Sequence, residues 1–124
     1  MKLVDLVDAL DLAVIAAAGQ LGNEVTGAYA SDLLSDVMAN SRAGNVWITL
    51  QVHVNIVAVA SLKEMSGIIL INGRRPEDDT AHKAETEAIP TMVSKLPAFE
   101  LIGRLYELGI RDGPVGDVPE PMKN

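Results

Sequence analysis

The sequence predicts a single α/β domain, built from a mainly parallel sheet of about five strands with helices on both faces. From residue 45 onward, short apolar runs alternate with segments of helical periodicity at intervals of about 20 residues, as in βαβ units. The run GIILING at 67–73 is almost continuously apolar, which is typical of a central parallel strand. A length of 124 residues without repeats or an evident linker suits one domain.

The first 44 residues predict a helix, two strands and a second helix, in that order. Apolar residues recur at helical spacing over 3–10, with aspartates on the opposite face. The short apolar run 11–18 is followed by glycines, which favours a strand. Segment 24–32 carries β-favouring valine, threonine and tyrosine, so it predicts the second strand. Segment 32–44 has helical spacing again and ends at Gly44.

The middle of the chain predicts a strand, a helix and a strand. The run NVWITLQ at 45–51 places several β-favouring residues in succession. Segment 55–65 is expected to form a buried helix that begins at Asn55, although its β-branched residues alone leave its type open. The apolar run 67–73 then supplies the central strand.

The remaining residues predict a helix, a strand, a helix and a tail. Over 75–88, Pro76 and three acidic residues suit the first turn of a helix. Segment 89–94 is expected to form a short strand, and 96–110 an amphipathic helix. We therefore place the α/β domain at residues 1–110 and expect 111–124, which contains three prolines, to be an extended C-terminal tail.

Charge and composition argue against several classes of protein. The formal net charge is −7, opposite in sign to the field that binds a nucleic-acid backbone. There are no cysteines, so disulfides and thiolate metal sites are excluded. No apolar run approaches the roughly 20 residues that span a bilayer, and the first residues do not resemble a signal peptide. We expect a cytoplasmic protein with neither nucleic acid nor membrane as a partner.

Polar residues follow the expected parallel strands at the same end of each strand. Because α/β proteins bind ligands outside the carboxyl ends of their strands, we expect these residues to form a ligand site. Two adjacent arginines and a helix N-terminus favour a small anionic ligand, and Gly73 would let the backbone approach it closely. The candidate ligand-binding residues are Ser31, Asp32, Gln51, His53, Asn55, Gly73, Arg74, Arg75 and Ser94.

These candidates also have structural interpretations. Strand-to-helix turns carry polar residues that cap the following helix, a role open to Ser31, Asp32, Asn55 and Ser94. The arginine pair at 74–75 can form ion pairs with the acidic residues at 77–79. Both alternatives stay open at the level of the sequence.

His53 is one of only two histidines, and the sequence favours a structural or ligand-contact role for it over catalysis. No HExxH spacing is present, and His82 falls within a surface-type helix, so no metal site is expected. His53, Asp32 and either candidate serine could form a triad, but the GxSxG turn is absent. The phosphate-binding patterns GxxxxGK[ST] and GxGxxG are absent too. We expect no catalytic residue and no cofactor; a hydrolase using Asp32 and His53 is the third-ranked hypothesis.

Two stretches carry a resemblance to a known family, namely YASDLLSDVMANSRAGNVWITLQVHVNIVAVASLKEMSGIILING at 29–73 and AIPTMVSKLPAFELIGRLYELGI at 88–110. In these stretches the chain resembles small stand-alone DRTGG-domain proteins of anaerobic bacteria and archaea. The literal Asp-Arg-Thr-Gly-Gly string does not occur. Such domains also accompany CBS domains and are similar in fold to the N-terminal domain of HPr kinase/phosphorylase.

The resemblance implies a regulatory or ligand-sensing module that is often dimeric, and it suggests a redox protein as partner because relatives are often encoded near iron-only hydrogenase systems. Our leading hypothesis is a non-enzymatic sensor for a small anionic metabolite or nucleotide. The alternative is a homodimeric interaction module without a small ligand, in which the helix at 55–65 or at 96–110 packs across a two-fold axis.

Overall fold

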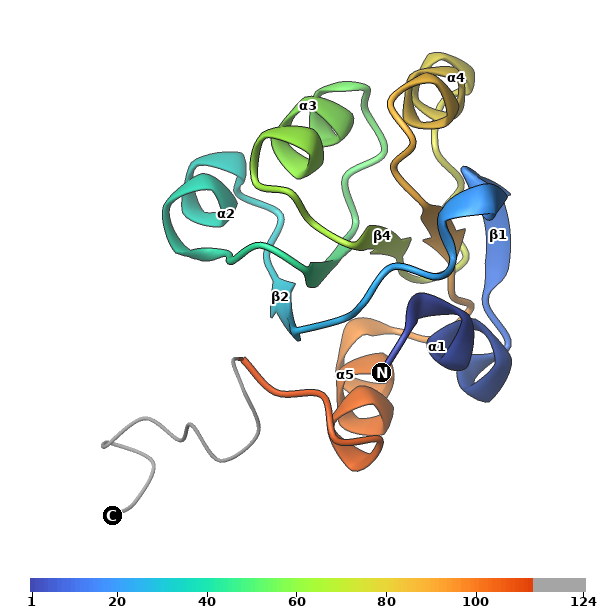
Figure 1. Ribbon diagram of the computed structural model, residues 1–124, viewed down its shortest axis with the longest axis vertical. Helices are drawn as coiled ribbons and strands as arrows, with labels where there is room; N and C mark the ends of the chain where they lie inside the picture. Colours follow the sequence, from blue (N-terminus) through green and yellow to red (C-terminus); the bar gives the residue numbers. More distant parts are fainter. Residues whose placement is uncertain (113–124) are drawn as a thin grey trace.

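The structure is a computed structural model that describes residues 1–112, and its helices and strands alternate along the chain (Figure 1). The helices are α1 (Leu3–Leu10), the short 3₁₀ helix η1 (Ala18–Gln20), α2 (Leu34–Asn40), α3 (Asn55–Leu62), α4 (Asp78–Thr86) and α5 (Ala98–Glu107). The strands are β1 (Ala13–Ala16), β2 (Gly27–Ala30), β3 (Asn45–Thr49), β4 (Gly67–Leu70) and β5 (Thr91–Val93). Each expected helix and strand up to residue 110 is present; α1 has the expected bounds, the other elements are shorter than the sequence suggested, and η1 was not expected.

The strands form one sheet in the order β1-β5-β4-β3-β2. Neighbours from β2 to β5 are parallel, whereas β1 pairs antiparallel with β5 at the edge. The mainly parallel five-stranded sheet expected from the sequence is therefore confirmed. Because α2, α3 and α4 each connect adjacent parallel strands, strands β2 to β5 follow one another across the sheet in chain order, whereas β1 lies at the edge beside β5.

Helices cover both faces of the sheet, with α2, α3 and α4 on one side and α1 and α5 on the other (Figure 1). Each face buries its own apolar core because side chains alternate along the strands. In β4, Ile68 and Leu70 belong to the core under α2–α4, while Ile69 belongs to the core under α1 and α5. Two-sided burial explains the uninterrupted apolar run in this strand.

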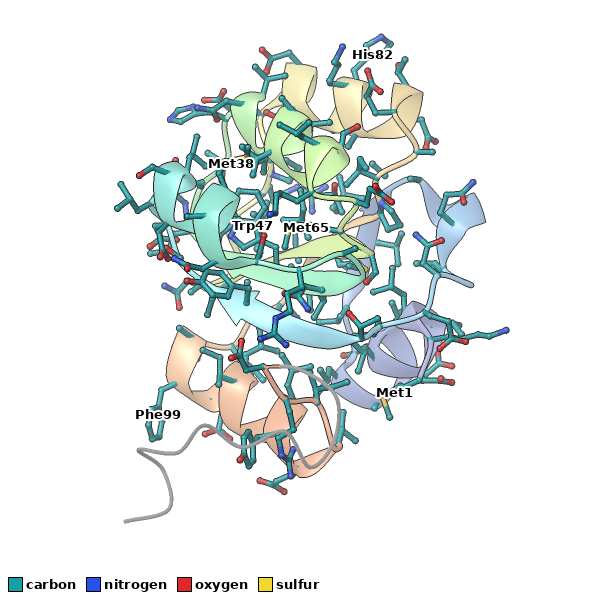
Figure 2. All side chains as sticks on the ribbon, turned by 60° about the vertical axis from the view of Figure 1, so that its left-hand side comes forward. Met1, Met38, Trp47, Met65, His82 and Phe99 are labelled. Atoms are coloured by element: carbon teal, nitrogen blue, oxygen red, sulfur yellow. The ribbon has the colours of Figure 1, made fainter. Side chains whose placement is uncertain are left out.

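Trp47 in β3 is fully buried in the core under α2–α4 (Figure 2). Its indole Nε1–H donates a hydrogen bond of 2.9 Å to the carbonyl oxygen of Ser31. The only tryptophan of the chain thus joins the centre of the sheet to the loop that follows β2.

The chain beyond α5 packs back onto the domain at Arg111. The amide of Ala28 in β2 donates a 2.9 Å hydrogen bond to the Arg111 carbonyl, and the Arg111 guanidinium lies 3.6 Å from the centroid of the Tyr106 ring. From residue 113 onward, the tail expected over 111–124 lies outside the described residues. No helix within residues 1–112 is both long and apolar enough to cross a membrane.

Candidate functional site

Four loops follow the carboxyl ends of the parallel strands and lie next to one another along one edge of the sheet. They are the β2 loop (31–33), the β3 loop (50–54), the β4 loop (71–77) and the β5 loop (94–97). Eight of the nine candidate ligand residues lie in these loops, and Asn55 is the first residue of α3. Hydrogen bonds join each loop to the next, as described below.

Asp32 joins the β2 loop to the β3 loop. Its Oδ1 accepts hydrogen bonds of 2.7 Å from the Thr49 hydroxyl and from the Leu50 amide. In return, the Gln51 side-chain amide donates to the Asp32 carbonyl at 3.1 Å. Asp32 therefore does not cap α2, which was one of its expected roles; its carboxylate holds the neighbouring loop instead.

The β3 loop is tied to the start of α4. The carbonyl oxygen of Val52 accepts hydrogen bonds from the Glu77 amide at 3.2 Å and from the Thr80 hydroxyl at 2.8 Å. His53 Nδ1 lies 3.0 Å from Glu77 Oε2, with both side chains about half exposed. His53 thus pairs with Glu77, so the structure lends no support to a triad in which Asp32 orients the histidine.

The β4 loop begins with a tight turn at Asn72-Gly73. Both residues have positive φ, 58° and 66°, and the Arg74 amide donates to the Ile71 carbonyl at 3.0 Å, which defines a type I′ turn. The amides of Asn72 and Gly73 donate to the carbonyls of Leu96 and Ser94 in the β5 loop. Gly73 is explained by this backbone conformation, and its amide already has a partner.

The two candidate serines stabilise their own loops. Ser31 Oγ accepts from the Leu33 amide at 3.2 Å, and the buried Ser94 Oγ accepts from the Leu96 amide at 3.1 Å. Neither hydroxyl caps a helix directly, since the caps of α2 and α5 are Leu33 and Pro97. Their local bonds shape the loops that surround the sheet edge.

Arg74, Arg75 and Lys95 have no ion-pair partner within residues 1–112. Lys2, Lys63 and Arg111 have none there either, but they lie outside the four loops of this edge. The first three are exposed and lie on the β4 and β5 loops, which the Asn72 and Gly73 amides bond together. The alternative pairing of the arginines with the acidic residues at 77–79 is not observed within residues 1–112, and Glu77 pairs with His53 instead. Asn55 is exposed, and α3 has no side-chain cap and no acidic residue in its first turn.

Lys95 was absent from the candidates that the sequence supplied, although it directly follows Ser94 at the end of a strand. The pairing of His53 with Glu77 was missed for another reason: the two are 24 residues apart, and no local pattern connects them. In the sequence, His53 and Glu77 follow two neighbouring strands, and this was the only signal that could have indicated that the two residues lie close together.

A second polar cluster lies beside the β2 loop. The Tyr29 hydroxyl lies 2.9 Å from both carboxylate oxygens of Asp36, and the Asn40 side-chain amide donates to Asp36 Oδ1 at 2.9 Å. Hydrogen bonds from Ser31, Tyr29 and Asn40 lower the pKa of the Asp36 carboxyl. Burial, together with the neighbouring Asp36, raises the pKa of Tyr29.

An apolar cavity of about 120 Å³ lies away from this edge, between β2 and α5. Its walls include Ala30, Ile48, Ile102, Leu105 and Tyr106. Its lining offers few hydrogen-bonding groups, so it does not suit an anion. Within residues 1–112, no group of three or more histidine, aspartate or glutamate side chains is arranged to hold a metal ion.

No protein-family model and no curated protein matches the sequence. Among solved structures, the chain is similar to the CBS and DRTGG domains of the regulatory region of Clostridium perfringens pyrophosphatase, complexed with the activator diadenosine tetraphosphate. The TM-score is 0.64 at 16% identity. The match covers 92% of this chain and 48% of the other, so this chain spans about half of that region. The likeness shows the fold, which is consistent with the DRTGG-like fold expected from the sequence.

Proposed function

We propose that this protein is a non-enzymatic regulatory module that binds a small anionic ligand, a nucleotide or an acyl phosphate, at the carboxyl edge of its parallel strands. The observation that carries the proposal is the group of unpaired cations on the β4 and β5 loops: Arg74, Arg75 and Lys95. The chain as a whole is strongly acidic, with a net charge of −7. A local group of guanidinium and ammonium ions in such a chain favours binding of carboxylate or phosphate oxygens.

The loops around these cations support binding rather than catalysis. The carboxylate of Asp32 and the hydroxyls of Ser31 and Ser94 already hold backbone groups in place. Fixed loops keep the arginines in position before the ligand arrives, which limits the entropy lost on binding. The pyrophosphatase region of similar fold is regulatory and is complexed with a nucleotide activator, which supports a nucleotide as one ligand class.

We further propose that the ligand changes the affinity of the module for a partner protein, and the family resemblance suggests a redox protein. The β3 and β4 loops are the elements that could transmit such a change, since His53 and Glu77 join them at an exposed position.

A thermal-shift experiment with ATP, acetyl phosphate and inorganic pyrophosphate tests the site. A ligand that binds only the folded state raises the melting temperature. We expect at least one of these anions to stabilise the protein, and the Arg74→Ala variant to lose most of that shift. Removal of one charged hydrogen bond of about 1.5–3 kcal/mol weakens binding by about 10- to 150-fold.

Arg104→Ala is the matched control, because Arg104 lies on α5 and pairs with Glu100 on its own helix. It should retain the full shift. A shift that survives in Arg74→Ala, or that Arg104→Ala reduces equally, would contradict the proposed location.

A further inference from the structure

The apolar cavity between β2 and α5 lies outside the site proposed above. Its volume is about 120 Å³, and its walls come from β2, β3, α5 and the segment that follows α5. On the strand side the walls include two small residues, Ala28 and Ala30, which leave room beneath the helix. On the helix side, Ile102 is 38% exposed and Tyr106 54%, so the cavity is accessible from solvent.

Arg111 also lines this cavity, and part of its guanidinium group is unused. Its Nη1 donates to the carbonyls of Tyr106 at 2.6 Å and of Ile110 at 3.0 Å, and the group lies 3.6 Å from the centroid of the Tyr106 ring. Nε and Nη2 have no hydrogen-bond partner within residues 1–112. These two nitrogens form an edge of the guanidinium that can bind both oxygens of a carboxylate. The arginine is therefore held in place before a ligand binds.

Asp112 brings a negative charge to the same cavity. Its carboxylate has no hydrogen bond or ion pair among residues 1–112. The backbone of 111–112 rests on β2, because a Cβ at Gly27 would lie 2.6 Å from the Arg111 carbonyl oxygen and 3.2 Å from that of Asp112. The cavity thus combines apolar walls with one guanidinium and one carboxylate group.

We propose that this cavity binds a free aliphatic α-amino acid of the size of leucine. Its side chain would occupy the apolar walls, its α-carboxylate would bind Arg111, and its α-ammonium group would bind Asp112. A simple carboxylate is repelled by Asp112 and a simple amine by Arg111, whereas a zwitterion is attracted by both. A zwitterion also has no net charge, so the net charge of −7 does not oppose its approach.

The volume of the cavity favours an aliphatic side chain over an aromatic one. An engineered apolar cavity of roughly 150 Å³ in another protein accepts a benzene ring. The cavity described here is somewhat smaller, at about 120 Å³, and suits a branched aliphatic group.

Titration of the full chain with L-leucine, followed by amide chemical shifts, tests the proposal. We expect saturable shifts that cluster in β2, α5 and residues 110–112. Arg111→Gln should weaken binding by about tenfold or more, because it removes the charged partner of the carboxylate. Arg104→Gln is the matched control, because Arg104 is an exposed arginine of α5 that pairs with Glu100 outside the cavity, and it should bind leucine like the wild type.

A second variant keeps Arg111 and fills the cavity instead. Ala30 is exposed in β2, so Ala30→Leu should fold, place its larger side chain in the cavity and abolish leucine binding. No saturable shifts with leucine, or an affinity that neither Arg111→Gln nor Ala30→Leu lowers, would overturn the proposal.

Ligand analogues test the amino-acid class. Isocaproate lacks the ammonium group, isopentylamine lacks the carboxylate and glycine lacks the side chain, so each should bind about tenfold more weakly than leucine or worse. Isocaproate that binds as tightly as leucine would overturn the assignment of an amino acid. These residues and ligands differ from those of the anion site, so failure here leaves the proposed function untouched.

Discussion

The residues at the sheet edge differ in whether their side chains already have partners within the protein or are still available to contact a ligand. Asp32, Gln51, Ser31 and Ser94 have partners within the loops, whereas Arg74, Arg75 and Lys95 have no ion-pair partner among residues 1–112. This difference explains why the sequence could place these residues at one edge of the sheet but could not rank them as ligand contacts. A polar residue at a strand end is equally compatible with holding a loop and with contacting a ligand, and only atomic distances separate the two roles.

Asp32 provides a test of the loop-holding role. We predict that Asp32→Ala lowers the free energy of unfolding by about 1–2 kcal/mol, because its carboxylate accepts two short hydrogen bonds but is exposed to water. Urea unfolding followed by the fluorescence of Trp47 measures the loss. Asp8→Ala removes an exposed aspartate for which no hydrogen bond or ion pair is found and should change stability little. Equal effects of the two substitutions would contradict the role assigned to Asp32.

Asp36 makes a pH-dependent contribution to stability. Hydrogen bonds from Ser31, Tyr29 and Asn40 hold its pKa below the ordinary value of 3.8. A lowered folded-state pKa gives stability that is present above pH 3.8 and is lost as the pH falls through the folded-state value. We therefore predict that Asp36→Asn flattens the acid side of the melting-temperature profile, while Asp8→Asn leaves it unchanged. If the melting temperatures of the wild type and of Asp36→Asn decreased equally as the pH is lowered, this assignment would be disproved.

At the scale of elements, the local patterns predicted the α-helices and strands up to residue 110, but not the 3₁₀ helix η1, because the core on each face imposes a clear periodicity. The continuous run at 67–73 and the helical spacing at 96–110 are the clearest cases. The ends were less accurate: the predicted strand 67–73 extended past β4 because Asn72-Gly73 forms a turn directly after apolar Ile71. Asn-Gly is the preferred pair for a type I′ turn, so the signal was present.

This turn gives an element-scale prediction. Gly73 has a φ of 66°, so a side chain there is strained even though no atom would crowd its Cβ. We predict that Gly73→Ala lowers the free energy of unfolding by about 1–2 kcal/mol. Gly22→Ala, at another open position without positive φ, should cost little. Urea unfolding of Gly73→Ala and Gly22→Ala measures the difference in their free energies of unfolding. Equal stabilities of the two variants would contradict the turn assignment.

At the scale of the whole molecule, the order of the strands in the sheet could not be predicted from the sequence and was established by the structure. The antiparallel pairing of β1 with β5 joins Ala13 to Val93, and no local pattern reports a contact over that separation. The same reasoning applies to the cavity between β2 and α5, whose walls come from separate parts of the chain. The molecule thus has two distinct surfaces: a cationic edge formed by loops and an apolar face formed by α5.

The central claim is that a small anion binds at the cationic edge, and amide chemical-shift mapping by NMR tests it most directly. On titration of the full chain with inorganic pyrophosphate, we predict that the largest shifts cluster in the β4 and β5 loops, at 72–75 and 94–96, with smaller ones in the β3 loop. Arg74→Ala should remove most of these changes. Shifts confined to β2 and α5, or no saturable shifts in the wild type, would contradict the account.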